Sequence, residues 1–330
     1  MSNRVFKRKI YDKILQWKEE SRGQSALMIQ GARRIGKSTI VEEFARNEYA
    51  SHIIIDFNKV SPQVKSLFDD LMDLDFIFLQ LQAIYNVVLQ ERKSVIIFDE
   101  VQKCPNARQA IKYLVKDGRY DYIETGSLIS IKQNTKGITI PSEEERLDMY
   151  PMDFEEFRWA LGDTTSIPLI KTFFDRRMPL GAAHRTKQRD LRLYMLVGGM
   201  PEAVKTWVEF HDYVRCQEVQ DDIVVTYEDD FPKYKKNVDP VLLRQTLRSA
   251  AVQITKKFVY SKVGPGYKTV EVQKAVELLT LAGILHPVTH TDANGLPLGS
   301  ERDESYQKML LLDPGLMLRL LNMSLGDISE

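Results

Sequence analysis

Short apolar runs alternate with stretches of helical spacing over the first part of the chain. Runs of strand type cover residues 26–29, 52–57, 94–98 and 120–124. Residues 39–46 and the region 68–90 carry apolar positions at helical intervals. The run at 94–98 lacks polar alternation, which is typical of a strand buried on both faces of a parallel sheet. The pattern therefore predicts a three-layer α/β domain whose ligand crevice lies at the carboxyl ends of its strands.

The pattern changes after the last of these strands. Residues 130–148 break the alternation, with a short hairpin expected at 137–141 and a solvated loop at Glu143, Glu144 and Glu145. Residues 153–232 have helical spacing. We therefore place domain limits at 1–150, a helical region at 151–237 and a third domain at 238–330.

The last part of the chain predicts helices at 240–255 and 268–282, a short element at 259–263, and strands at 284–291 and 307–312. Val272, Ala275, Val276 and Leu279 form one stripe of the 268–282 helix. This order is that of a winged helix. Lys268 and Lys274 are offset by Glu271 and Glu277. Packing against the preceding domain or a partner is therefore at least as good an interpretation as DNA reading.

The composition narrows the class of protein. The chain has 330 residues, 43% of them hydrophobic, and its 46 basic residues balance 46 acidic ones. A neutral chain argues against uniform coating by nucleic acid, but a local basic surface remains an option. Two cysteines cannot form a disulfide framework. Without a signal sequence or a membrane-length apolar run, a cytoplasmic protein that makes no membrane contact is expected.

Residues 31–38 carry the strongest chemical signal. They read Gly-Ala-Arg-Arg-Ile-Gly-Lys-Ser and match the phosphate-binding pattern G-x-x-x-x-G-K-[ST] between a strand and a helix. The loop's backbone N–H groups and the following helix N-terminus attract phosphate. Lys37 is expected to reach the β- and γ-phosphates and Ser38 to ligate Mg²⁺. The predicted nucleotide-binding residues are Gly31, Ala32, Arg33, Arg34, Ile35, Gly36, Lys37, Ser38 and Thr39.

Two further strand ends add polar groups to the same predicted crevice. Asp99 and Glu100 end the apolar run that starts at residue 94. Asp99 is expected to hold Mg²⁺ and Glu100 to orient and polarise the attacking water. The segment Thr125-Gly126-Ser127 ends the next strand. We expect Ser127 to hydrogen-bond the γ-phosphate or the water, although an ordinary strand-to-turn exit explains the segment equally well.

These motifs resemble AAA+-type ATPases of the archaeal and bacterial "ATP-binding protein" group. The resemblance rests on the phosphate loop, then Phe98-Asp99-Glu100-Val101-Gln102, then Thr125-Gly126-Ser127. Residues 149–157, 198–203 and 306–316 resemble later boxes of the group that have no assigned chemistry. The resemblance implies a P-loop NTPase sheet, a helical region and a winged-helix domain. Members usually continue into a nuclease-like domain. No residues up to Glu330 correspond to it, so the resemblance implies no nuclease activity, and the chain is either naturally short or truncated.

The resemblance implies an ATPase that uses ATP and Mg²⁺ to drive a conformational switch. It leaves open a homo-oligomer, and a DNA or protein partner of the C-terminal domain. Sites of this type are generally completed by an arginine from a neighbouring subunit, for which Arg146 is one option. The alternative is a nucleotide-gated binding module with little turnover. The second carboxylate, Glu100, favours hydrolysis, and no acceptor motif supports a kinase.

Two further segments of the chain are rich in basic residues. Residues 4–20 predict an amphipathic basic helix, from which Arg8 or Tyr11 could contact a nucleotide base, although a solvated helix packing by one face is favoured. Residues 171–192 hold seven basic and two acidic residues. They form either a solvated helix face or a contact surface for nucleic acid or phosphate.

Overall fold

The computed structural model of the chain describes residues 5–127, 142–235 and 237–323. The chain divides into two compact units, Met1–Tyr150 and Pro151–Glu330. The predicted separation of 151–237 from 238–330 remains a prediction. The hairpin expected at 137–141 lies outside the described residues.

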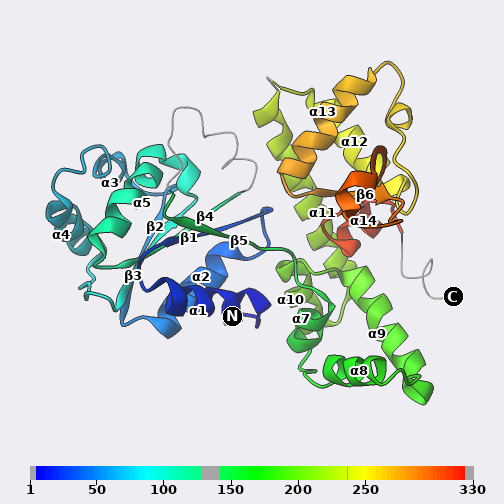
Figure 1. Ribbon diagram of the computed structural model, residues 1–330, viewed down its shortest axis with the longest axis horizontal. Helices are drawn as coiled ribbons and strands as arrows, with labels where there is room; N and C mark the ends of the chain where they lie inside the picture. Colours follow the sequence, from blue (N-terminus) through cyan, green and yellow to red (C-terminus); the bar gives the residue numbers. More distant parts are fainter. Residues whose placement is uncertain (1–4, 128–141, 236, 324–330) are drawn as a thin grey trace. The chain divides into compact units, whose positions relative to one another are not determined.

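A five-stranded parallel sheet forms the centre of the first unit. Its strands are β1 (Ala26–Gly31), β2 (Ser51–Asp56), β3 (Ser94–Asp99), β4 (Asp121–Ser127) and β5 (Glu144–Asp148). They lie in the order β2-β3-β4-β1-β5 (Figure 1). Every side chain of β3 and β4 is buried, as expected for central strands covered on both faces. The predicted α/β class and parallel sheet are confirmed.

Helices cover both faces of this sheet. The helices α3 (Pro62–Ser66), α4 (Leu74–Tyr85) and α5 (Pro105–Asp117) pack on one face around a core that includes Phe57, Phe98 and Tyr122. The helices α1 (Lys9–Ser21) and α2 (Lys37–Glu48) lie on the other side (Figure 1). A 3-10 turn, η1 (Val101–Lys103), joins β3 to α5. The three-layer arrangement places all five carboxyl ends of the strands at one edge.

The sequence 143–145 is not the solvated loop that we expected. Glu144 begins β5, beside Ala26 of β1, and its side chain is fully buried. It accepts a bidentate pair from the buried Arg108 of α5 at 3.0 Å, and a bond from Arg146 at 2.7 Å. Burial and the adjacent Glu144 carboxyl raise the pKa of Glu124 well above its usual value. The ion pairs explain why an acidic segment enters the sheet: its charge is neutralised by two arginines.

The second unit is helical with one antiparallel hairpin. Its helices are α7 (Phe154–Ala160), α8 (Ser166–Asp175), α9 (His184–Val197), α10 (Pro201–Phe210), α11 (Tyr213–Asp230), α12 (Pro240–Val252), α13 (Thr269–Leu281) and α14 (Pro314–Leu320). Short 3-10 turns occur at η2 (Gly181–Ala183), η3 (Phe231–Tyr234), η4 (Tyr260–Lys262) and η5 (Leu298–Glu301). No helix in the described parts of either unit is long and apolar enough to cross a membrane.

The hairpin consists of β6 (Leu285–Thr291) and β7 (Arg302–Leu311). The start that we predicted for the second strand, at residue 307, is wrong by five residues, since β7 begins at Arg302. Residues 302–306 are exposed and polar, so their sequence carries no buried alternation. Backbone pairing extends them nonetheless, past a register shift between Thr289 and His290. The predicted second element, 259–263, is reduced to η4.

Three sequence boxes of the second unit meet at one buried carboxylate. Asp313 begins α14 as its N-cap, accepting from the backbone N–H of Leu316 at 2.9 Å. Its other oxygen accepts from the N–H of Gly199 at 2.6 Å. The carbonyl of Gly199 in turn accepts from the N–H of Met152 at 2.7 Å. Asp313 is 1% exposed. These boxes therefore hold the unit together, which accounts for their lack of assigned chemistry.

We predict that Asp313→Asn destabilises the second unit. The amide keeps the shape but turns an N–H donor towards the N–H of Leu316 or Gly199, so one buried donor loses its acceptor. Such a loss costs about 1–3 kcal/mol. Chemical denaturation measures the effect. Asp239→Asn is the matched control, because Asp239 caps α12 in the same Asp-Pro context but is exposed. Equal stabilities of the two variants would contradict the role of Asp313.

The pH dependence of the free energy of unfolding gives a second test of the role of Asp313. Burial raises the pKa of Asp313 from 3.8 to about 6, against the opposing effect of its backbone N–H donors. Between these values the native state binds a proton that the unfolded state has released. The contribution of Asp313 to the free energy of unfolding therefore falls as the pH rises from about 4 to about 6. In Asp313→Asn we expect the free energy of unfolding to lack this decrease with pH.

Candidate nucleotide-binding site

The loop from Gly31 to Ser38 joins the end of β1 to the start of α2. Gly36 caps α2 with a φ of 93°, a left-handed conformation that favours glycine. Gly31 permits a close approach of the chain, because a Cβ there would lie 2.3 Å from the carbonyl oxygen of Met149. The two glycines thus allow a tight turn that brings backbone N–H groups to the N-terminus of α2, where an anion is favoured.

Lys37 is the buried cation of this loop. Its ammonium group donates to the carbonyl oxygens of Gly31 at 3.1 Å and Ala32 at 2.6 Å. Burial lowers the pKa of Lys37 to about 8, although the carboxylates of Glu100 and Asp99 act in the opposite direction. Burial therefore disfavours the charged form of Lys37 more than these two carboxylates favour it. A phosphate group placed within its reach would add negative charge beside the ammonium group.

The loop is supported from outside the motif by Arg8. The Arg8 guanidinium donates to the carbonyl oxygen of Ile35 at 3.1 Å and to that of Tyr150 at 2.6 Å. Ile35 itself is completely buried. The suggestion that Arg8 or Tyr11 contacts a base does not agree with these bonds, since Tyr11 donates to Glu48 at 2.8 Å. Arg8 instead holds the middle of the loop in place.

Asp99 is the point where the loop and two strands meet. Its Oδ1 accepts from the Ser38 hydroxyl at 2.8 Å and also from the Thr125 hydroxyl. The Thr125 hydroxyl in turn accepts from the backbone N–H of Glu100 at 3.3 Å. Asp99 is 9% exposed. One carboxylate oxygen thus fixes α2, β3 and β4 relative to one another.

Glu100 stands just beyond the end of β3 with a left-handed φ of 55°. This conformation is uncommon for a residue with a side chain, and it turns the carboxylate out of the strand direction. Glu100 is only partly buried. Its Oε2 accepts from the side-chain amide of Gln102. The amide therefore sets the orientation of a carboxylate that remains accessible to solvent.

The donor groups at Asp99 suit a magnesium ion. Mg²⁺ prefers hard oxygen ligands and keeps several of its waters. The hydroxyl of Ser38 and the carboxylate of Asp99 lie within hydrogen-bonding distance of one another. They are the two residues that the sequence predicts as metal ligands, and a metal–phosphate group next to the loop would bring its cation to them.

The structure thus brings together the predicted residues 31–39, Asp99 and Glu100 at one edge of the sheet. Ser127 is buried at the end of β4, beside Gly31 of β1, and its role remains a prediction. Sequence reasoning missed Thr125 of the same segment, whose hydroxyl donates to Asp99. The register pairs Phe98 of β3 with Glu124 of β4, so that Asp99 and Thr125 follow side by side, and the sequence alone does not reveal this register.

Within its own chain, Arg146 lies away from the predicted phosphate site. It lies in β5 opposite Met28, in the middle of β1, and not at the carboxyl edge. Its guanidinium is paired with Glu144 at 2.7 Å. Arg146 therefore does not complete the site of its own chain, and a role towards a neighbouring subunit stays a prediction.

Two family models match the chain. An AAA domain matches residues 23–158, and a domain of unknown function matches residues 188–326. Residues 23–158 are an AAA domain. This agrees with the sheet order and with the site at its carboxyl edge, and it makes the first unit an AAA-family ATPase domain. A comparison with curated proteins gives no match.

Several solved structures resemble the model at low similarity. The Orc1 protein of Aeropyrum pernix in complex with DNA is 10% identical, with 97% of this chain and 94% of that one covered and a TM-score of 0.34. The Thermotoga maritima RuvB Holliday junction branch migration motor is 10% identical, with 85% and 89% covered and a TM-score of 0.38. Scores this low carry no argument about what this chain binds.

We predict that nucleotide binding takes up protons at alkaline pH. Lys37 has a pKa of about 8 in the empty loop, and a bound phosphate should raise it. At pH 8.5 the binding of Mg·ATP should therefore take up as much as about one proton, and affinity should fall as the pH rises further. Calorimetry in buffers of different ionisation enthalpy measures the uptake. No uptake at pH 8.5 would show that Lys37 is fully charged before binding.

Proposed function

We propose that the AAA domain binds Mg·ATP and hydrolyses it, with the energy used to switch conformation. The observation that carries the proposal is the carboxylate pair next to the loop: Asp99 is bonded to Ser38, and Glu100 is left accessible beside it. A site that only bound nucleotide would need Asp99 alone. The second carboxylate supports a hydrolytic function.

In this proposal each side chain has one role. Backbone N–H groups of residues 31–38 and the Lys37 ammonium hold the β- and γ-phosphates. Ser38 and Asp99 would hold a magnesium ion, which would supply positive charge beside the phosphates. Glu100 orients a water and accepts its proton as the water oxygen bonds to the γ-phosphorus. The bond between that phosphorus and the β–γ bridging oxygen breaks, releasing phosphate and ADP.

The contacts of Asp99 also suggest how hydrolysis could change the conformation. Ser38 lies on α2 and Thr125 on β4, and both bond to the same oxygen of Asp99. A metal ion held by Ser38 and Asp99 would take a lone pair of the hydroxyl oxygen and one of the carboxylate, and would so change the distance over which the hydroxyl donates to Asp99. The position of α2 relative to β3 and β4 would then depend on whether Mg·ATP or no nucleotide is bound.

The second candidate function is a nucleotide-gated module that binds DNA or a protein through residues 238–330 and turns over slowly. The hairpin β6–β7 and the helices α12 and α13 support a winged-helix arrangement. The side chains of β7 are mostly exposed, so the hairpin has a surface available for a partner. Turnover measured with and without duplex DNA separates this function from hydrolysis by the isolated chain.

We predict that Glu100→Gln retains Mg·ATP binding and slows hydrolysis. The amide preserves the shape and the contact with Gln102 but removes the group that accepts the proton. Loss of a general base typically costs about 10²- to 10⁴-fold. Single-turnover hydrolysis and nucleotide titration measure the two effects separately. Glu91→Gln, an exposed position before β3, is the matched control. A Glu100→Gln rate equal to that of the control would assign proton transfer to another group.

We also predict that Lys37→Ala loses most of its affinity for Mg·ATP. The variant removes the buried ammonium group at the loop and leaves the backbone N–H groups. Direct titration with ATP measures the loss, and Lys93→Ala, at an exposed lysine, serves as the control. Unchanged ATP binding by Lys37→Ala would remove the basis for placing nucleotide at this loop.

A further inference from the structure

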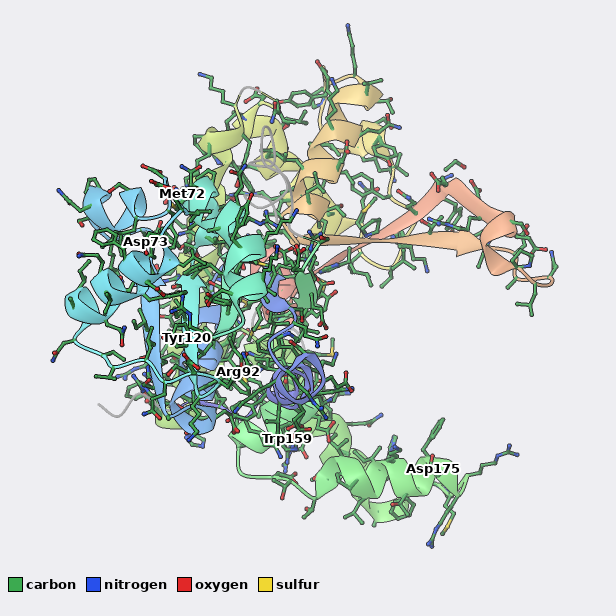
Figure 2. All side chains as sticks on the ribbon, turned by 60° about the vertical axis from the view of Figure 1, so that its left-hand side comes forward. Met72, Asp73, Arg92, Tyr120, Trp159 and Asp175 are labelled. Carbon is green, nitrogen blue, oxygen red and sulfur yellow. The ribbon has the colours of Figure 1, made fainter. Side chains whose placement is uncertain are left out.

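The helices α8 and α9 form an arm with almost no core of its own. Within residues 167–195 no side chain is fully buried. Several large apolar side chains are exposed there, of which Phe174 is the most exposed at 80%. The others are Leu169, Met178, Leu191 and Met195. Figure 2 shows side chains around Asp175, at the end of α8, pointing away from the rest of their unit. We call residues 167–195 the basic arm.

The basic arm also carries a strong positive charge. It contains seven basic residues and two acidic ones. Asp190 is already paired with Arg158 at 3.2 Å and with Lys187 at 3.5 Å. The exposed basic side chains are Lys171, Arg176, Arg177, Arg185, Arg189 and Arg192. Arginine, methionine and aromatic residues mixed in this way are typical of protein interfaces and not of a solvated helix face.

The first unit has a surface of the opposite charge. Residues 66–90 contain four aspartates and no lysine, arginine or glutamate. All four aspartates, at positions 69, 70, 73 and 75, are exposed. Met72, just before α4, is 93% exposed, and Phe76 and Leu79, which are neighbours on one side of α4, are 53% and 64% exposed. We call Asp69, Asp70, Met72, Asp73, Phe76 and Leu79 the acidic face. Figure 2 labels Met72 and Asp73 in the part of the first unit that carries α3 and α4.

Two charges of the acidic face, those of Asp70 and Asp73, are not compensated within the described ranges, whereas Asp69 lines a hollow together with Lys65 and Lys103. Asp70 accepts from the N–H of Met72 at 2.9 Å, and Asp73 caps α4 by accepting from the N–H of Phe76 at 2.9 Å. Among the described residues neither aspartate forms an ion pair. Asp75, by contrast, pairs with Arg119. Two aspartates next to three exposed apolar side chains therefore remain available to a basic, apolar partner.

We propose that the basic arm of one copy of this chain docks on the acidic face of a second copy. The two surfaces match in charge, and each has exposed apolar side chains that the contact would remove from water. Two different surfaces meet, so the contact is heterologous and adds copies head to tail, into a ring or a filament. The proposal concerns surfaces outside the nucleotide site and does not depend on hydrolysis.

Nucleic acid fits the basic arm less well than a second copy does. Phosphates would pair with the arginines but would leave Phe174, Leu169 and Met178 in water, because duplex contacts are made mostly to phosphate and sugar. Nucleic acid would also leave the acidic face unexplained. A second copy accounts for both surfaces at once.

Sedimentation of the full chain over a range of concentrations up to about 100 µM tests the proposal. We expect concentration-dependent association that weakens as salt is raised, because exposed charges are screened. Two charge reversals should each raise the dissociation constant about tenfold or more. They are Arg185→Glu with Arg189→Glu on the arm, and Asp69→Lys with Asp70→Lys on the face. Lys112→Glu with Lys116→Glu, exposed on α5, is the matched control and should associate normally.

Mixing the two reversed variants gives the decisive measurement. The reversed arm of one then meets the reversed face of the other, and the unchanged arm meets the unchanged face. Association absent from either variant alone should return in the mixture. Phe174→Ser should also weaken association without lowering the melting temperature, because this side chain is exposed in the single chain. Circular dichroism and ATP titration verify that each variant is folded.

Three results would overturn the proposal. The first is a wild-type chain that stays monomeric over the whole concentration range. The second is a reversal that changes the shape of the monomer without changing its mass, with no recovery on mixing, which would place the arm on the face of its own chain. The third is a pair of reversals that associate like the control. Loss of duplex binding by the arm variant in a monomeric protein would assign the arm to nucleic acid.

Discussion

The hydrogen bonds to one oxygen of Asp99 fix the geometry on which the rest of the site depends. Ser38 reaches this oxygen from the first turn of α2, and Thr125 reaches it from β4. Asp99 is itself set by β3, a fully buried strand that pairs with β2 on one side and β4 on the other. The phosphate loop is thus positioned by side-chain bonds to a neighbouring strand as well as by its own backbone. A loop with the same eight residues but no Asp99 would lose the hydrogen bond through which Ser38 is held to β3.

Away from the site, side-chain contacts to a buried carboxylate also fix the strands of the AAA domain. Glu144 lies in the sheet because Arg108 and Arg146 neutralise it, and burial and Glu144 raise the pKa of the adjacent Glu124. Removing one partner would leave an uncompensated buried charge, which is strongly destabilising. The cluster fixes β5, the edge strand beside β1, and with it the chain that returns past Gly31. Within its own chain, Arg146 therefore stabilises the frame of the site without taking part in it.

Local patterns were sufficient to predict the sheet and most of the loop. Lys37 and Ser38 are recognisable because they belong to one short motif between a strand and a helix. Asp99 is recognisable because it ends an apolar strand. Thr125 and Arg8 were not recognisable in these roles. The bond from Thr125 to Asp99 depends on the register of β3 and β4, and the bonds from Arg8 cross 27 and 142 positions of sequence. The start of β7 at Arg302 was missed for another reason. Residues 302–306 pair through their backbone but bury no side chain, so their sequence shows no strand pattern.

The two units differ in what their polar sequence boxes do. In the first unit the polar residues at strand ends gather at one edge of the sheet, beside the loop from Gly31 to Ser38. In the second, Asp313 is enclosed, and it joins Gly199 to the start of α14 with no accessible surface of its own. A motif made of glycine and aspartate therefore does not by itself indicate chemistry. The distinction lies in exposure: Glu100 is accessible and its contact with Gln102 leaves one carboxylate oxygen for water, whereas both oxygens of Asp313 are used by the backbone.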